Sequence, residues 1–132
     1  MSPDIPVDEV TAGWWDATRD RRLVLQKCRD CGHWQHYPRA LCTSCAGTDL
    51  GFEPAAGTGI VDTYTEVHRA ARPDLPPPYL VARVRLDEGP VILTHLVGVD
   101  AVQQLIDRTV DVDWSPLTDG RHLPVFRPRN SR

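Results

Sequence analysis

Alternating apolar and polar residues recur in short segments through the second half of the chain. A two-residue period of this kind is typical of strands that turn one face toward a core. In the first such segment, Val61 and Thr63 fall on one face, whereas Asp62 and Tyr64 fall on the other. The pattern predicts five strands, over residues 60–68, 79–86, 91–97, 110–114 and 123–126.

A short helix is predicted between the third and fourth of these strands. It covers residues 100–106, with Asp100 as a possible N-cap and Val102, Leu105 and Ile106 directed inward. Five strands with one short helix at this place fit a small Greek-key barrel of the OB type. Twelve prolines and nine glycines also favour short strands and turns over long helices.

The first half of the chain begins with a predicted amphipathic helix over residues 9–21. Val10, Trp14, Trp15 and Ala17 fall near one face of this helix. Two readings of the adjacent tryptophans stay open. They pack onto the core of this chain, or part of their surface is covered by another protein, since aromatic residues are enriched at interfaces.

Four cysteines follow a predicted strand over residues 22–27. Cys28, Cys31, Cys42 and Cys45 form two CxxC pairs separated by ten residues, and they are all the cysteines of the chain. Two such knuckles place four thiolates around one point, the closed tetrahedral shell that structural zinc prefers, with iron as the main rival metal. Gly32 and Gly47 are expected to supply the positive φ of the knuckle turns.

A hairpin is predicted between the two knuckles. His33 and His36 lie there, but four cysteines already fill the metal shell, so neither is expected to bind the metal. The hairpin would present Trp34, Tyr37 and Arg39. These side chains either stack on a flat ring such as adenine or pack the ribbon against the rest of the protein.

Charge and composition limit the possible functions. The chain has 132 residues, a net charge of −3 and a pI of about 5.9, and nucleic-acid binders are usually basic. No apolar run is long enough to span a bilayer, and the first residues lack the features of a secretory signal. We therefore expect a cytoplasmic protein without disulfides.

Basic residues concentrate around the cysteines. Residues 19–45 carry six basic and two acidic side chains, in a chain that is otherwise acidic. This segment is either a solvated face with local ion pairs or a docking surface for an anion such as a phosphate. No nucleophile elbow, phosphate loop or dinucleotide fingerprint is present, so the sequence predicts no catalytic residues.

Several segments of the chain, in one fixed order, carry a resemblance to a known family. They are Trp14–Ala17, Leu23–Arg39, Cys42 with Cys45, Gly57–Gly59, Leu93–Gly98 and Leu123–Phe126. Over residues 9–128 the chain resembles the family that joins a rubredoxin-like zinc ribbon to an OB-fold, known as domain of unknown function 35. Ala46 departs from the family pattern, because a glycine is frequent there.

The resemblance implies an accessory subunit and not a free enzyme. Members partner thiolase-fold enzymes of acyl-CoA metabolism, some of which act as retro-aldolases in the shortening of steroid side chains. The partner carries the C–C bond chemistry, while the small domain completes the acyl-CoA site and docks partners. A CoA thioester and a structural Zn²⁺ are the implied ligands, and Trp14, Trp15, Trp34, Tyr37 and Arg39 the candidate acyl-CoA or partner contacts.

The resemblance leaves two questions open. In this family the domain is encoded alone or behind a MaoC-like enoyl-CoA hydratase, so the chain is either free-standing or a fragment of such a fusion. Zinc ribbons and OB-folds also serve as single-stranded nucleic-acid-binding modules, which is the alternative function.

The predicted organisation is therefore mainly β. It divides into an N-terminal helical segment at residues 1–21, a zinc ribbon at 22–54, an OB-fold barrel at 55–128 and a disordered tail at 129–132.

Overall fold

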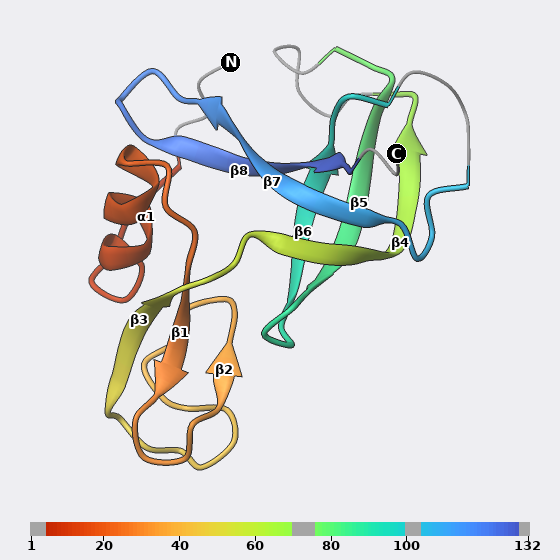
Figure 1. Ribbon diagram of the computed structural model, residues 1–132. Helices are drawn as coiled ribbons and strands as arrows, with labels where there is room; N and C mark the ends of the chain where they lie inside the picture. Colours follow the sequence, from red (N-terminus) through yellow and green to blue (C-terminus); the bar gives the residue numbers. More distant parts are fainter. Residues whose placement is uncertain (1–4, 70–75, 100–103, 130–132) are drawn as a thin grey trace.

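A three-stranded sheet, a five-stranded barrel and one short helix make up the fold (Figure 1). The computed structural model describes residues 5–69, 76–99 and 104–129. The predicted tail at 129–132 lies outside this part of the chain except for Arg129. No helix within it is both long and apolar enough to cross a membrane.

The first sheet carries the cysteine knuckles. Its central strand is β1 (Val24–Cys28), which pairs antiparallel with β2 (Trp34–Gln35) on one side and β3 (Leu50–Pro54) on the other. The buried side of β1 includes Leu25, which is fully inaccessible. Because β1 ends at Cys28, the sheet positions the first cysteine directly.

The barrel closes in the strand order β4-β5-β6-β8-β7. Its one parallel pairing joins β6 to β8, where Leu96 lies opposite Phe126, and β7 closes the barrel against β4. Val61, Val84, Val110 and Phe126 fill the interior and have no exposed surface. The strands are β4 (Thr58–Val67), β5 (Tyr79–Leu86), β6 (Val91–Leu96), β7 (Thr109–Pro116) and β8 (His122–Pro128). The predicted OB-type barrel and its five strands are thus confirmed.

A β-bulge changes which residues of β4 point into the barrel. The pairing of β4 with β5 shifts between Val61 and Thr63, so one residue is inserted and the alternation reverses. Val61 points into the core, but Thr63 is exposed, and Tyr64 packs against the core instead. The predicted regular alternation over residues 60–68 was therefore wrong beyond Val61.

The predicted helix over residues 100–106 is not helical where the structure describes it. Gln104 and Leu105 are irregular, and Ile106 begins a turn. Leu105 is buried as predicted, whereas Ile106 is 42% exposed. Asp100 and Val102 lie outside the described residues.

Helix α1 (Ala12–Arg19) is shorter than the predicted helix and lies between the ribbon sheet and β8 (Figure 1). Its buried face carries Trp14, Trp15, Ala17 and Thr18. At its end, the Nδ1–H of His122 donates to the carbonyl oxygen of Thr18 over 2.8 Å. The helix therefore ties the two sheets together from one side.

Candidate functional site

The four cysteine sulfurs converge on one point. Their Sγ atoms all lie within 4.8 Å of one another. The Sγ atoms of Cys28 and Cys45 are 3.7 Å apart, and so are those of Cys31 and Cys42. Sulfurs around a tetrahedral zinc, at about 2.3 Å from the metal, lie roughly 3.8 Å from one another. The donor set therefore fits a closed four-sulfur metal site.

The two knuckles have matching backbone geometry. The N–H of Gly32 donates to the carbonyl of Cys28, and the N–H of Ala46 donates to the carbonyl of Cys42, both over 2.9 Å. Gly32 and Ala46 both adopt positive φ, at 78° and 63°. The prediction that Gly47 supplies this conformation was wrong, since Ala46 adopts it despite the cost of its Cβ, about 1–2 kcal/mol.

Backbone donors favour the thiolate form of Cys42 in the second knuckle. The N–H groups of Cys45 and Ser44 lower the pKa of Cys42 to about 7. Metals bind thiolates and not thiols. The backbone around Cys42 therefore favours a metal-ligating thiolate, whereas hydrogen bonds with the Cys31 and Cys28 thiols raise the pKa of Cys45 to about 12.

The two histidines of the hairpin contact other side chains and not the cysteine sulfurs. Nε2 of His33 lies 3.1 Å from the hydroxyl of Thr43. The ring of His36 stacks between those of Trp14 and Tyr37, with centroid distances of 5.5 and 4.2 Å. Among the described residues, the group that could hold a metal contains the four cysteines and neither histidine.

Burial of His36 predicts a dependence of stability on pH. Its Nδ1 is buried without a partner among the described residues, and desolvation lowers its pKa to about 4. The unfolded chain, with a normal histidine pKa near 6.5, then binds a proton that the folded chain does not. The free energy of unfolding should therefore fall as the pH drops from about 6.5 toward 4.

The variant His36→Phe isolates this effect, because it keeps a ring and removes the titration. Between pH 7.5 and 5.5, the wild type should lose about 1–2 kcal/mol more stability than the variant. Denaturant unfolding of both proteins, with zinc supplied, measures the difference. Equal losses in the two proteins would contradict the buried, neutral state of His36.

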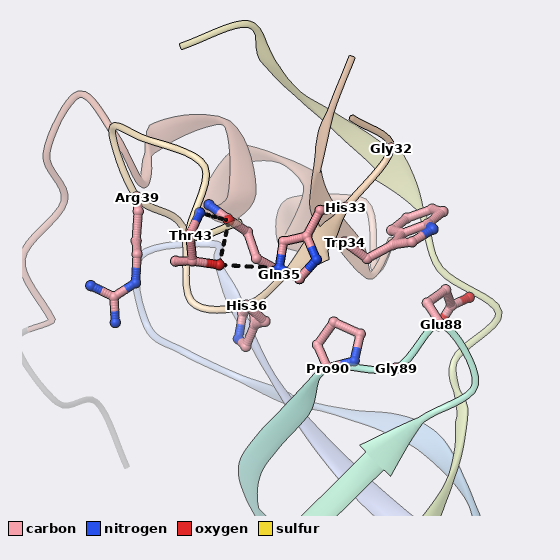
Figure 2. A pocket seen from close by; sticks show the side chains of 10 residues that line it. All are labelled: Gly32, His33, Trp34, Gln35, His36, Arg39, Thr43, Glu88, Gly89 and Pro90. Carbon is pink, nitrogen blue, oxygen red and sulfur yellow. Dashed lines mark hydrogen bonds between the residues drawn. The ribbon is translucent and has the colours of Figure 1, made fainter. Parts of the chain in front are cut away.

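A cleft of about 600 Å³ separates the hairpin of the ribbon from the turn between β5 and β6 (Figure 2). The hairpin contributes His33, Trp34 and Arg39 to its walls, and the turn contributes Glu88 and Pro90. Lys27 Nζ lies 4.8 Å from the centroid of the Trp34 ring. The walls of the cleft thus combine the guanidinium of Arg39 and the carboxylate of Glu88 with the aromatic surface of Trp34.

Arg39 is exposed at this cleft, and no described acidic side chain forms an ion pair with it. Other arginines nearby are engaged: the guanidinium of Arg29, for example, donates to Asp49 over 2.8 Å. An exposed arginine without an acidic partner is available to bind a phosphate. Trp34 and Arg39 therefore line one cleft, and their role in binding a ligand stays a prediction.

A second, apolar pocket of about 210 Å³ lies where α1, the hairpin and the barrel meet. Trp14, Trp15 and Tyr37 line it together with Leu93 of β6 and Pro124 of β8. Tyr37 and Leu93 are 48% and 60% exposed, and the N–H of Leu93 donates to the Tyr37 hydroxyl over 2.9 Å. This pocket gathers the other predicted contact residues.

The tryptophans of α1 belong mainly to the interior. Trp14 and Trp15 are only 7% and 9% exposed and are part of the hydrophobic core. The guanidinium of Arg121 lies 4.8 Å from the Trp15 ring centroid. These rings therefore pack on the chain's own core, as the first reading of the sequence expects, and they also line the apolar pocket, while their coverage by another protein stays a prediction.

Two glutamines have a place in the site that the sequence did not suggest. Gln26 and Gln35 lie opposite each other on β1 and β2, and each is only 5% exposed. Their side chains bond to each other and to the backbone of the loop that carries Arg39. A glutamine in an alternating strand is normally predicted to face solvent. The one available signal of burial was the apolar residue next to each glutamine, Leu25 beside Gln26 and Trp34 beside Gln35.

Comparisons with known proteins match the whole described fold. Residues 15–51 match the family model "ChsH2, rubredoxin-like zinc ribbon domain", and residues 52–115 match "ChsH2, C-terminal OB-fold domain". A solved chain of the "Ltp2-ChsH2(DUF35) aldolase" is 38% identical, with a TM-score of 0.85, over 96% of this chain and 98% of that chain.

Two curated relatives are hydratase subunits. The chain is 37% identical over 128 residues to the "Probable enoyl-CoA hydratase alpha subunit" of Thermomonospora curvata, which covers 97% of this chain. It is 27% identical over 111 residues, or 80% of its length, to the "3-oxo-4,17-pregnadiene-20-carboxyl-CoA hydratase alpha subunit" of Mycobacterium tuberculosis. The chain spans only 40% and 35% of the length of these two relatives.

Proposed function

The chain belongs to the ChsH2 family of DUF35 proteins, which join a zinc ribbon to an OB-fold, and we propose that it is an accessory subunit of a thiolase-fold acyl-CoA enzyme complex. In this proposal the partner carries out the C–C bond chemistry as a thiolase or retro-aldolase. The chain completes the acyl-CoA site and docks the partner, and it supplies no catalytic residue of its own.

One observation carries the proposal: the likeness to a chain of the Ltp2-ChsH2(DUF35) aldolase extends over nearly all of both chains. The names of the two hydratase relatives add CoA thioesters as a substrate class, one of them a steroid. These names support a role of the proposed complex in the breakdown of a steroid or lipid side chain. A MaoC-like enoyl-CoA hydratase is the second partner that we propose.

The two hollows of the structure suit different tasks in such a complex. The cleft with Trp34 and Arg39 has the chemistry to hold the nucleotide end of CoA, by stacking on the indole and by pairing with the guanidinium. The apolar pocket with the exposed Tyr37 and Leu93 suits a partner surface. We assign the first to the CoA thioester and the second to the thiolase-fold subunit.

The metal has a supporting role in this proposal. We propose that Cys28, Cys31, Cys42 and Cys45 hold a Zn²⁺ that stabilises the fold of the ribbon. A closed four-sulfur shell leaves no position for substrate, so the ion takes no part in the reaction. Both ribbon cysteine pairs flank the hairpin, and the hairpin in turn forms a wall of each hollow.

Capture of partners with the tagged full chain tests the proposed assembly. From a lysate of the organism that encodes it, at moderate salt, we expect a thiolase-fold protein in a stoichiometric amount, identified by mass spectrometry. Retention of single-stranded nucleic acid in place of such a protein would favour the alternative function, and its strong salt dependence would reveal it.

Two substitutions in the cleft should weaken CoA binding by the complex. Arg39→Ala removes charge-assisted bonds to phosphate, and Trp34→Ala removes a stacking surface, each worth about 1–3 kcal/mol or roughly tenfold in affinity. Titration of the complex with a CoA thioester measures the effect. The matched control is Arg85→Ala, because Arg85 is an exposed arginine on β5 that lies outside the cleft.

Both variants should remain folded. Arg39→Ala should melt close to the wild-type temperature because Arg39 is exposed, whereas Trp34→Ala should melt somewhat lower because the indole packs against the core. Unchanged affinity in both cleft variants would exclude this cleft as the CoA site. A loss of the same size in Arg85→Ala would show that general charge, and not the cleft, attracts the ligand.

A further inference from the structure

We propose that the buried side chains of Gln26 and Gln35 form a relay that couples the metal knuckle to the loop presenting Arg39. This inference goes beyond the proposed function, since it concerns how the ribbon holds its own hairpin. Its test measures only zinc transfer and amide hydrogen exchange, so the outcome does not depend on whether CoA binds.

The relay begins at the second knuckle. The carboxamide of Gln35 bonds to the backbone on both sides of Cys42: its Oε1 accepts from the N–H of Thr43 over 2.9 Å, and its Nε2 donates to the carbonyl of Leu41 over 3.2 Å. The Thr43 hydroxyl donates to the same Oε1 over 3.1 Å. Gln35 therefore fixes the backbone position of a metal ligand without touching the sulfur.

The relay continues through a bond between the two glutamines. Nε2 of Gln35 donates to Oε1 of Gln26 over 2.6 Å. Both side chains are almost completely buried, and a buried carboxamide that loses its partner costs about 1–3 kcal/mol. Either glutamine therefore holds the other in one orientation, and movement of one disturbs the other.

The relay ends at Arg39. Oε1 of Gln26 accepts from the N–H of Arg39 over 2.9 Å, and Nε2 of Gln26 donates to the carbonyl of Arg39 over 2.8 Å. The side chain thus bonds the backbone of Arg39 at both its polar groups, as a neighbouring strand would. Residues 36–41 belong to no strand, so these bonds set the course of the loop.

Coupling follows because one continuous set of bonds joins the two ends. A metal that fixes Cys42 stabilises the orientation of Gln35, hence that of Gln26 and the backbone of Arg39. By thermodynamic reciprocity, a ligand or partner that fixes Arg39 must strengthen metal binding by the same factor. The ribbon would then hold its metal most tightly when the hairpin is engaged.

The test compares zinc-loaded wild type with Gln26→Met, Gln35→Met and the double variant. Methionine keeps the approximate volume of glutamine and removes its hydrogen bonds. Two rates are measured: transfer of zinc to a chromogenic chelator, and hydrogen exchange of the Arg39 amide. The control is Gln104→Met, since Gln104 is an exposed glutamine outside the ribbon.

Gln35→Met should speed zinc transfer by roughly 10–100-fold, the range for residues that orient metal ligands. Gln26→Met should speed Arg39 exchange and also speed zinc transfer about tenfold, since its contact with the knuckle runs through Gln35. For the same reason the double variant should lose zinc no faster than Gln35→Met. Gln104→Met should behave as the wild type.

Two results would overturn the relay. One is zinc transfer at the wild-type rate in Gln26→Met, which would make Gln26 a local support of the loop. The other is effects on zinc transfer that multiply in the double variant, which would show that Gln26 acts through β1 and not through Gln35. If Gln26→Met does not fold, exchange of the Arg39 amide in Gln35→Met decides instead: the relay requires it to be faster than in the wild type, and a wild-type rate would overturn the relay.

Discussion

Replacing Cys42 with serine should deprive the chain of its metal and unfold the ribbon. A structural zinc site contributes an apparent binding free energy of about 10–16 kcal/mol, most of which appears as folding free energy. The ribbon has little else to hold it, since β2 contains two residues and residues 36–41 form no strand. Loss of one thiolate from a four-sulfur shell therefore removes the main stabilising contribution to this part of the chain.

Zinc content and backbone NMR measure this result. The wild type should bind one zinc per chain, and Cys42→Ser should bind little at the same free zinc concentration, with the amide signals of β1 to β3 collapsed. Ser44→Ala is the matched control, because Ser44 lies inside the same knuckle and its side chain is not a ligand. A Cys42→Ser protein that keeps its zinc and its ribbon would contradict the four-sulfur assignment.

The barrel and the cysteines could be predicted from the sequence because each depends on local spacing. A period of two identifies a strand wherever one face is buried, and the β5 prediction over residues 79–86 matches the structure at both ends. The CxxC spacing likewise fixes which sulfurs can meet, and the structure brings all four together. Both features can be predicted without knowing which distant segments of the chain are in contact.

The errors arose where tertiary contacts decide the local structure. The bulge after Val61 depends on how β4 pairs with β5 while also closing the barrel against β7, which the pattern of β4 alone does not contain. Ala46 adopts the left-handed conformation because the knuckle bond to Cys42 requires it. Leu105 is buried without a helix, so an inward-facing residue there did not imply helical structure.

The candidate site was predictable by residue type but not by arrangement. The sequence singles out an arginine and two aromatic residues in the hairpin, and the structure divides them between a polar cleft and an apolar pocket. That division depends on the packing of the hairpin against β6 through the Tyr37 hydroxyl. Gln26 and Gln35 were missed because their bonds join segments that only the closed loop brings together.

A charge at the mouth of the apolar pocket should abolish docking of the partner. Leu93 is 60% exposed on β6 and lines this pocket, so Leu93→Glu leaves the barrel core intact and places a carboxylate where we propose that the thiolase-fold subunit packs. Burying an unpaired carboxylate at an interface costs at least about 3 kcal/mol, or roughly 100-fold in affinity.

The matched control is Ile60→Glu, which separates this effect from a general effect of charge on the barrel. Ile60 is an apolar residue of β4, 46% exposed, that lines neither hollow. Co-purification and titration calorimetry with the captured partner should show binding by Ile60→Glu and not by Leu93→Glu, while both variants melt near the wild-type temperature.

If both variants bind the partner, the partner docks on another face of the chain, and some other molecule must cover the exposed Tyr37 and Leu93. If neither binds, the partner covers the outer face of the barrel far beyond the pocket, because Ile60 and Leu93 lie on strands separated by β5.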